Sequence, residues 1–351
     1  MTPRYICFGW LSLVLLGANL CCGNSQNASV QPRVLSNANA PLVTPTYDGS
    51  GQAIHPGIVY IPGGWHGFSY WMVMTPYPNY EVSVENPSIL ASNDGVVWQV
   101  PPGLTNPVTN GTGELADGEL FYDAASDQLW MYYIRSAYPT TWLVRRMSSD
   151  GVTWASPEDV VTIPKNSLLS PAVAKIGGKY YLWYVNAWPD GWSASSSTVE
   201  YRTSNDGKNW SDATTCQISQ AGYVIWHIDV LPVQVNNPDS NNYEDRQWML
   251  LAAFPVGSSS GATKLFFADS GDAVHWTTYS QPVLGPGKGW DSGQIYRSTL
   301  LYDAANDLIK VWYSARNAGT PAPPAGYMYT WHTGYTKEHY ANLHAWLSQE
   351  L

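Results

Sequence analysis

The sequence predicts an all-β protein, a five-bladed β-propeller of four-stranded antiparallel blades with a short C-terminal helix. Three observations carry this prediction. One turn motif recurs along the chain, short apolar runs recur in the same order around every copy, and 18 Trp and 24 Tyr accompany a charged content of only 13%. Repetition of units too small to bury a core alone is typical of propellers and other repeat architectures.

The recurring motif is an Asp-Gly turn followed by tryptophan. It reads SNDGVVW from Ser92, SSDGVTW from Ser148, SNDGKNW from Ser204 and, less faithfully, SGDAVHW from Ser270, at intervals of 56, 56 and 66 residues. A further step of 66 residues reaches Thr336 in WHTGYT, where the approach to the turn is present but the turn is missing. Four complete units and one truncated unit therefore predict five blades.

Each unit contains four runs typical of strands. In the second unit, DGELFYD leads through a turn to QLWMYYIRS, which is followed by LVRRMSS and the Asp-Gly turn. Asp-Gly between strands indicates a tight hairpin, because glycine accepts positive φ and aspartate bonds its own backbone. We interpret the motif as structural rather than as a calcium loop, which needs more oxygen ligands. The motif tryptophans are expected to pack between neighbouring sheets: Trp98, Trp154, Trp210 and Trp276.

The start of the chain predicts export. Residues 1–23 are interpreted as a signal peptide, with Arg4 before an apolar core, so we expect a secreted or periplasmic protein without a transmembrane span in its mature chain. Lipid anchoring at Cys21 or Cys22 is the alternative, but the flanking sequence GANLCC lacks the small residue that usually precedes a lipidated cysteine. Cys216 is then the single remaining cysteine, so no internal disulfide is expected.

The rest of the chain divides into three parts. Residues 24–51, rich in Asn, Ser and Pro, are expected to be a flexible lead-in. The propeller is expected to span 52–336, and 337–351 to form a helical cap. One face of this helix would carry Tyr340, Leu343 and Leu347.

The charge balance excludes one class of partner. The chain carries 17 Lys and Arg against 27 Asp and Glu, a formal net charge of −10, without a basic stripe that could follow a phosphate backbone. Nucleic acid is therefore not expected as a partner, and we expect a monomer.

The first run of each unit opens with polar residues. In a propeller the innermost strand of every blade begins at the central channel, so these residues are expected to form the ligand site. They differ from the Val and Ile that begin a purely structural strand. The five openings are His55-Pro56, Asp117-Gly118-Glu119, Ser170-Pro171, Trp226-His227-Ile228-Asp229 and Tyr296-Arg297-Ser298.

With these features the chain resembles the five-bladed glycoside hydrolase propellers, a superfamily that includes arabinanases, β-xylosidases, invertases and levansucrases. The resemblance covers residues 52–336 and is carried by the blade count, the polar openings of the inner strands and the Asp-Gly turns. In detail the chain is similar to secreted and phage-associated proteins that share YWM..TPYP, ENP, SNDG..W, WH.D and IYRS. A sialidase is not indicated, because sialidase repeats place one residue between the Asp and the Gly that are adjacent here.

The resemblance implies a carbohydrate ligand and hydrolysis of a glycosidic bond by carboxylates on the first three inner strands. Such hydrolysis needs one carboxyl group to protonate the departing oxygen and another to activate water or attack carbon. The chain departs from this pattern at two positions. His55-Pro56 stands where the family pattern has Asp-Pro, and Ser170-Pro171 stands where a Glu is expected, so other carboxylates must refill the site.

Three carboxylates are candidates for catalysis. Asp229 lies two residues after His227, and residues two apart on a strand face the same side. Glu85, in VENPSIL, is expected to point inward across the channel, near the aromatic TPYPNY, which resembles a sugar-stacking wall. We hypothesise an inverting glycosidase in which Asp229 and Glu85 act as base and acid, in either order, and Asp117 tunes their pKa values. Inversion requires the two working carboxyl groups to lie roughly 6.5 to 9.5 Å apart.

A wider set of residues is expected to bind the sugar. Arg297 is a candidate substrate clamp, or else the counter-charge that keeps Asp117 ionised, or one half of a buried ion pair. The alternatives for the other candidates are also structural: a His227 satisfied by Asp229, and a Glu85 that is an ordinary loop residue. The predicted substrate-binding residues are His55, Asn86, Glu119, Ser170, Trp226, His227, Trp290, Asp291, Tyr296 and Arg297.

No cofactor is predicted. Asp117, Glu119, His227 and Asp229 are suitable metal ligands, but their spacing is not diagnostic, and the resemblance leaves open only a structural calcium ion on the axis. Zinc is not expected, since the chain has no cysteine set and no helical histidine pair. Two other functions stay open. A non-catalytic carbohydrate-binding propeller would need only one carboxyl group in its cavity, and a protein-interaction scaffold would need an exposed apolar patch.

Overall fold

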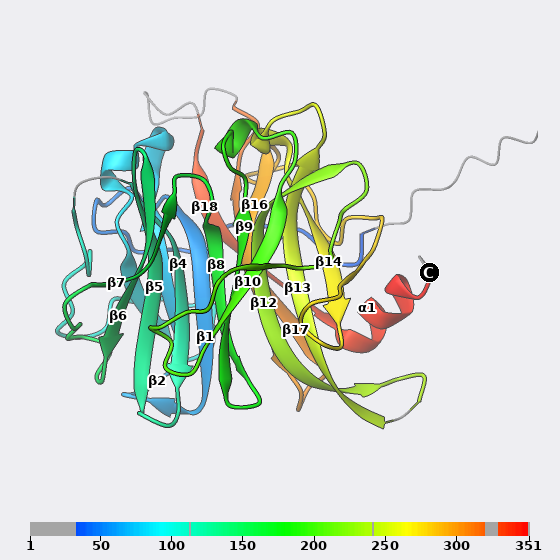
Figure 1. Ribbon diagram of the computed structural model, residues 1–351, viewed down its shortest axis with the longest axis horizontal. Helices are drawn as coiled ribbons and strands as arrows, with labels where there is room; N and C mark the ends of the chain where they lie inside the picture. Colours follow the sequence, from blue (N-terminus) through cyan, green and yellow to red (C-terminus); the bar gives the residue numbers. More distant parts are fainter. Residues whose placement is uncertain (1–32, 112–113, 241, 320–328, 350–351) are drawn as a thin grey trace, which may run out of the picture. The chain divides into compact units, whose positions relative to one another are not determined.

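The structure is a computed structural model that describes residues 33–111, 114–240, 242–319 and 329–349. The predicted signal peptide lies outside these residues, with both of the cysteines considered for lipid anchoring. Five antiparallel sheets, each formed by consecutive strands, follow one another along the chain (Figure 1). The predicted five-bladed β-propeller is confirmed. In the described part of the chain, no helix is both long and apolar enough to cross a membrane.

Blades two, three and four have the four strands expected from the repeats, and the first strand of each is the innermost. Blade two comprises β4 (Glu114–Asp123), β5 (Gln128–Ala137), β6 (Thr140–Ser148) and β7 (Glu158–Pro164). Blade three comprises β8 (Leu169–Ile176), β9 (Lys179–Asn186), β10 (Thr198–Ser204) and β11 (Thr214–Thr215). Blade four comprises β12 (Tyr223–Asn237), β13 (Asn242–Pro255), β14 (Lys264–Ser270) and β15 (Thr277–Thr278).

Blades one and five have three strands each, where four were expected. Blade one comprises β1 (Ala53–Trp65), β2 (Phe68–Pro76) and β3 (Ser88–Ser92), and its fourth position is reduced to one bridge between Ala91 and Gln99. Blade five comprises β16 (Gln294–Asp303), β17 (Leu308–Arg316) and β18 (Trp331–His339). Blade five lacks the Asp-Gly turn, so the chain passes from β18 directly into helix α1 (Tyr340–Leu347).

The hydrophobic cores lie between blades. At the junction of blades one and two, Trp71 and Ile89 pack with Leu120 and Met131. Clusters of the same kind occupy the other four junctions. The apolar side chains are therefore removed from water without filling the axis, and the inner strands remain free to present polar groups there.

The Asp-Gly turns connect neighbouring blades. In the first turn Gly95 has a φ of 74°, and its carbonyl oxygen accepts hydrogen bonds from Trp98 Nε1 at 3.1 Å and from Trp312 Nε1 of blade five at 2.7 Å. The rings of Trp71 and Trp130 pack against Gly151 and Gly207 of the next two turns, without a hydrogen bond from their indole N–H groups. All four motif tryptophans belong to or pack against the clusters between blades, which confirms their predicted position.

Two flanking segments pack onto the propeller. Residues 33–51 form neither helix nor strand, but Leu35 is buried and donates its N–H to Val283 O at 3.1 Å, and Leu42 donates its N–H to Thr333 O at 2.8 Å. These contacts hold the segment against the blades, which corrects the expectation of a flexible lead-in for this part of it. Helix α1 forms where predicted. It buries Tyr340, Leu343, Trp346 and Leu347 in the cluster between blades four and five.

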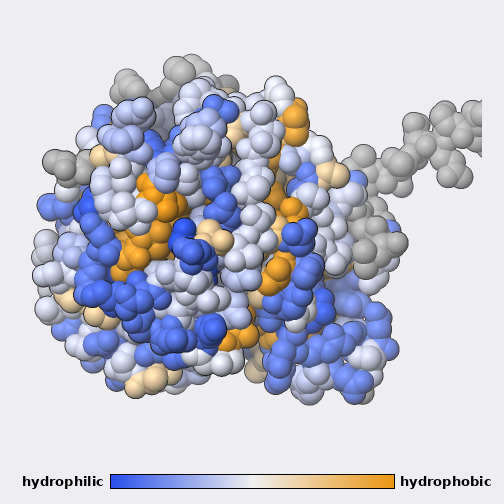
Figure 2. Space-filling view, viewed as in Figure 1, coloured by the Kyte–Doolittle hydropathy of each residue, from blue (hydrophilic) through white to orange (hydrophobic). Residues whose placement is uncertain are grey.

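The outer face shown in Figure 2 is largely hydrophilic. Hydrophobic residues appear on it in narrow strips rather than as one broad patch. This face therefore does not favour the interaction scaffold, which would need such a patch.

Replacing Gly95 with alanine should destabilise the fold. A Cβ atom there would lie 2.7 Å from the ring of Trp312, in addition to the strain of φ 74°. Gly49 has the same φ of 74° with nothing within 4 Å, so Gly49→Ala measures the strain alone. We expect a loss in the free energy of unfolding of about 1 kcal/mol for Gly49→Ala and about 2 to 4 kcal/mol for Gly95→Ala, measured by chemical denaturation. Equal losses of unfolding free energy in the two variants would show that the Trp312 ring can move aside without destabilising the fold.

Candidate functional site

The upper end of the channel, where the inner strands begin, is shaped by β-bulges. Each inner strand shifts register against its neighbour close to its start, in all five blades. A bulge adds a residue to one strand and re-aims its side chain. The polar residues that these bulges contain or adjoin include His55, Asp117, Ser170, His227 and Arg297.

Three of these positions have a backbone conformation that side chains disfavour. His55, Asp117 and Ser170 have φ values of 57°, 53° and 52°, in the left-handed region. Each such residue costs on the order of 1 kcal/mol. Three successive inner strands carry this strain at equivalent places, which indicates that the fold keeps it in order to place these residues at the axis.

Two histidines converge on one carboxylate beneath the upper mouth. Asp117 Oδ1 lies 3.3 Å from His55 Nε2 and 3.6 Å from His227 Nδ1. One ligand atom from each of the three residues lies within 4.8 Å of the others, and all three side chains are buried. We call His55, Asp117 and His227 the axial triad.

The axial triad has the chemistry of a metal site. His55 Nε2, Asp117 Oδ1 and both ring nitrogens of His227 are buried without a hydrogen-bond partner. Buried polar atoms normally have partners, so unbonded atoms that face each other favour a ligand between them. Imidazole nitrogens with a carboxylate suit Zn²⁺, Mn²⁺ and related divalent ions. The sequence prediction of no metal site did not foresee this cluster, because its members lie on three different blades.

The protonation states also suit a metal ion. Burial lowers the pKa of His227 to about 3, against the opposing charge of Asp117, so its ring is neutral. Burial acts to raise the pKa of Asp117, but interactions with the two neighbouring histidine rings, the Arg297 guanidinium and the N–H of Ser170 outweigh burial and bring the pKa to about 2. A neutral imidazole and an ionised carboxylate are the forms that bind metal.

Glu85 supports the axial triad from behind His55. Its Oε1 lies 3.3 Å from His55 Nδ1, whereas the Asp117 carboxylate faces Nε2, the other nitrogen of the ring. The N–H of Asp117 also points at Nδ1, at the longer distance of 3.4 Å, and would favour the opposite tautomer. A proton on Nδ1, shared with the closer Glu85 carboxylate, leaves the Nε2 lone pair for a metal ion. Burial raises the pKa of Glu85 to about 7, although His55 opposes the shift. The prediction that Glu85 points inward is therefore in agreement with the structure.

Tyr296 and Trp226 cover the axial triad. The ring of Tyr296 lies 4.4 Å from that of His227 and 5.5 Å from that of His55, and its hydroxyl accepts a hydrogen bond from Trp226 Nε1 at 3.0 Å. Burial raises the pKa of Tyr296 well above its usual range, so the phenol keeps its proton. Both side chains, predicted to bind the sugar, stand between the triad and the open mouth.

Above these two side chains lies a cavity of about 540 Å³, the upper cavity. The predicted aromatic wall is present, since Tyr77 and Tyr80 line it. The sequence analysis did not identify several other lining residues, because they come from loops, from the end of β17 and from the first residues of β4 and β18. Trp192 was visible as one of two tryptophans in NAWPDGW, a run of turn residues. The missed lining residues include Glu114, Lys165, Trp192, Arg316 and Trp331.

Arg297 closes the channel below the axial triad. Its guanidinium donates to Gly118 O and Pro171 O, each at 2.9 Å, and to Glu119 Oε2 at 3.1 Å, and it lies 3.9 Å from Asp117 Oδ1. It is buried and lines neither of the cavities at the two ends of the channel. Of the three predicted roles, the structure selects the buried ion pair and counter-charge and not the substrate clamp.

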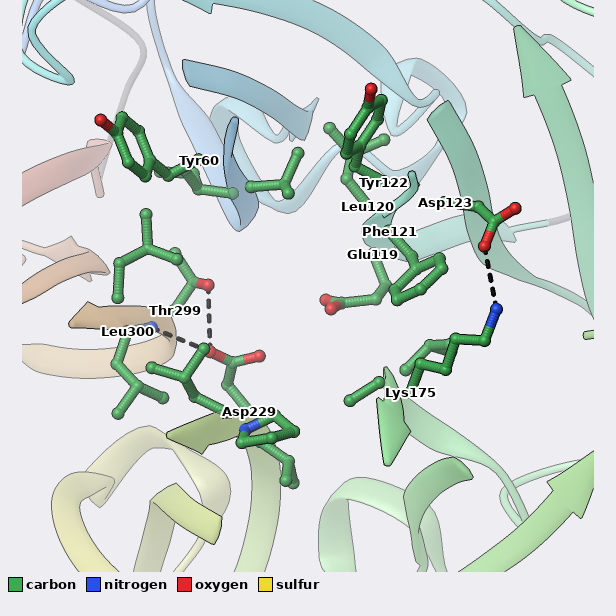
Figure 3. A pocket seen from close by; sticks show the side chains of 18 of the residues that line it. Tyr60, Glu119, Leu120, Phe121, Tyr122, Asp123, Lys175, Asp229, Thr299 and Leu300 are labelled. Carbon is green, nitrogen blue, oxygen red and sulfur yellow. Dashed lines mark hydrogen bonds and ion pairs between the residues drawn. The ribbon is translucent and has the colours of Figure 1, made fainter. Parts of the chain in front are cut away.

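Asp229 and Glu119 lie on the other side of Arg297. They line a second cavity of about 590 Å³, the lower cavity, in which their carboxyl groups face one another (Figure 3). Asp229 Oδ2 accepts hydrogen bonds from Thr299 Oγ1 at 3.0 Å and from Leu300 N at 2.8 Å. Burial raises the pKa values of both carboxyl groups, and that of Glu119 rises well above its usual range.

This arrangement corrects the predicted catalytic pair. Glu85 lies beside the axial triad, whereas Asp229 is bonded at the lower cavity, so the two do not face one substrate. His227 and Asp229 both face the axis, as their spacing predicted, but they occupy different levels of it. His227 is therefore not satisfied by Asp229.

Four predicted binding residues serve the scaffold instead. Ser170 Oγ donates to Ile228 O at 2.8 Å and joins two inner strands. Asn86 Nδ2 donates to Tyr47 OH at 2.9 Å. Trp290 donates to Ala38 O at 3.0 Å, and Asp291 accepts from Asn37 Nδ2 at 2.7 Å, so both fasten the segment before blade one. Their polar atoms are used within the fold, and none of the four lines the upper cavity.

The chain is similar to a sugar deacetylase. No family model matches it. Among curated proteins, the A type blood N-acetyl-α-D-galactosamine deacetylase of Flavonifractor plautii is 27% identical over 322 residues, with 77% of this chain and 40% of that protein covered. The chain thus spans less than half the length of this relative. The crystal structure of an N-acetylgalactosamine deacetylase from F. plautii, in complex with blood group B trisaccharide, matches with a TM-score of 0.80 and 25% identity over 90% of this chain and 98% of the other.

Glycoside hydrolases share the fold at lower identity. A thermostable family-43 glycoside hydrolase matches with a TM-score of 0.59 and 14% identity, over 86% of this chain and 92% of the other. The catalytic domain of the Coprinopsis cinerea GH62 α-L-arabinofuranosidase matches with a TM-score of 0.57 and 14% identity, over 87% and 96%. The resemblance to glycoside hydrolase propellers is confirmed for the fold, and the proteins with this fold include a deacetylase as well as hydrolases of glycosidic bonds.

The axial triad should bind one divalent ion per chain. After treatment with a chelator, titration with Mn²⁺ or Zn²⁺ should show one site by calorimetry, and the ion should raise the melting temperature because it binds only the folded state. His227→Ala should weaken the metal affinity by about 100-fold or more. Loss of a residue that only hydrogen-bonds a metal ligand typically weakens affinity by about 10 to 100-fold, and loss of a ligand itself should cost more.

His275→Ala is the matched control, since His275 is an exposed histidine paired with Asp272 on an outer turn. It should bind metal as the unaltered chain does. Equal affinity of the His227→Ala variant and the unaltered chain would refute the site.

Proposed function

We propose that the chain is a carbohydrate-processing enzyme that removes the acetyl group from an N-acetylated sugar, with a divalent metal ion held by the axial triad. The observation that carries the proposal is the convergence of three buried, unbonded ligand groups at the head of the channel. The similarity to an N-acetylgalactosamine deacetylase supports the choice of substrate class.

Deacetylation is the hydrolysis of an amide. Water adds to the carbonyl carbon, the C–N bond breaks, and the proton lost by the water ends on the nitrogen, which gives acetate and an amino sugar. The reaction needs a base for the water, a hydrogen-bond donor for the oxygen that gains negative charge, and a proton for the nitrogen. A divalent ion, when bound, supplies Lewis acidity, which polarises a carbonyl group and lowers the pKa of water.

Glu85 and Tyr296 are placed to assist. Glu85 contacts His55 Nδ1 and so holds that ring in position, and a carboxyl group with a pKa of about 7 can take up a proton and return it near neutral pH. Tyr296 accepts a hydrogen bond from Trp226, so its own O–H is available to donate to a carbonyl oxygen. The upper cavity provides room for the sugar beside them.

A second candidate is hydrolysis of a glycosidic bond in the lower cavity. Glu119 and Asp229 face one another there, as the two carboxyl groups of a glycosidase flank a sugar (Figure 3). Arg297 already engages Glu119, and apolar residues such as Ile58, Val173 and Leu231 dominate the wall. Few polar groups are left to hold sugar hydroxyls, so the upper site is the better-supported location.

The deacetylase is tested with two trisaccharides, the A type, which ends in N-acetylgalactosamine, and the B type, which ends in galactose. Acetate should be released from the first, detected by an acetate assay and by mass spectrometry of the sugar. Asp117→Asn should lower kcat/KM at least about 100-fold, because it removes the anionic ligand, and Glu85→Gln about 10 to 100-fold, because it acts behind His55.

Asp212→Asn is the control, an exposed carboxylate between β10 and β11 that should leave the rate unchanged. Release of free monosaccharide instead of acetate, abolished by Asp229→Asn, would favour the glycosidase.

A further inference from the structure

Two tryptophans are exposed on one loop beside the upper cavity. Of the tryptophans in the described ranges, only Trp188 and Trp192 are exposed, at 62% and 67%, and both lie in the loop between β9 and β10. Every other described indole is partly or fully buried, most of them between blades. Large aromatic side chains left in water commonly mark a binding surface.

The backbone of this loop is firmly held. Asn166 accepts a hydrogen bond at its carbonyl oxygen from Ala187 N at 2.9 Å and donates from Nδ2 to Pro189 O at 2.8 Å. Gly191, with a φ of 56°, fits against the same asparagine, and a Cβ there would lie 2.8 Å from its Nδ2. Ala194 is buried in a cluster with Trp226, which covers the axial triad. The indoles therefore project from a fixed support, which lowers the entropic cost of binding.

The loop leads outward from the upper cavity. Trp192 lines that cavity together with Asn166 and Trp226, whereas Trp188, four residues earlier, does not. The loop from Ala187 to Ser197 contains one charged residue, Asp190. Two flat apolar rings with a single exposed charge beside them suit the C–H faces of sugar rings, which are apolar while their edges carry hydroxyls.

We propose that Trp192 and Trp188 form a stacking platform for the glycan units that follow the sugar held in the upper cavity, so that the substrate is an oligosaccharide or a glycan chain rather than a free monosaccharide. The inference rests on the proposed function in placing the reacting sugar in the upper cavity. Trp192 contacts the second unit and Trp188 a unit further along the chain.

Calorimetric binding of two probes tests the platform without any need for turnover: methyl N-acetyl-α-D-galactosaminide and the A-type trisaccharide. The trisaccharide should bind about tenfold or more tightly than the methyl glycoside. Trp192→Ala should remove most of this advantage, and Trp192→Phe should keep part of it because an aromatic face remains. Tyr243→Ala is the matched control, since Tyr243 is 74% exposed on β13 and does not line the upper cavity.

Equal binding of both probes by the unaltered chain, or an unchanged ratio in Trp192→Ala, would overturn the platform. The chemistry is judged separately by acetate release. A tryptophan-dependent preference for the trisaccharide without acetate release would leave the platform standing and refute the deacetylase. Acetate release at equal rates from both probes, with no effect of Trp192→Ala, would support the deacetylase and refute the platform.

Discussion

The apolar side chains of this propeller are buried between blades, and this arrangement decides what the axis can hold. Tryptophans such as Trp71 and Trp312 fill the junctions and lie against the glycine of a neighbouring Asp-Gly turn. The inner strands therefore do not need to supply a central core, and bulges at their starts can aim polar side chains at the axis. Strain at His55, Asp117 and Ser170 is tolerated because the junctions around them fix the strands.

The polar axis leaves an imbalance of charge. Four buried carboxyl groups lie along it, from Glu85 through Asp117 to Glu119 and Asp229, and Arg297 is the one guanidinium among them. Buried carboxylates are costly unless they are paired or protonated. Below Arg297, the pKa values of Glu119 and Asp229 are raised, which favours their protonated, uncharged forms. Asp117 instead stays ionised between two histidines. A divalent ion at Asp117 would offset that charge, which is the physical reason to place the chemistry at the upper end.

The fold was predictable from sequence because its signals are local. An Asp-Gly turn, a following tryptophan and their intervals specify hairpins and their number without knowledge of distant contacts. The shortening of blades one and five was less accessible, since a fourth strand as brief as the bridge at Gln99 leaves no run to recognise. The inward position of His55, Asp117, His227 and Glu85 also followed from their place at the openings of inner strands or in the loop before β3.

The sequence by itself determined which residues reach the axis, because the alternation of a strand and the start of each repeat are properties of the chain. Only the tertiary structure decided which of them meet. His227 and Asp229 are two residues apart, yet one joins His55 and Asp117 while the other lines the opposite cavity. That division depends on Arg297, whose guanidinium reaches carbonyl groups of blades two and three and separates the two levels. Contacts among five separate blades have no signature in the order of residues, since each is set by the closure of the ring.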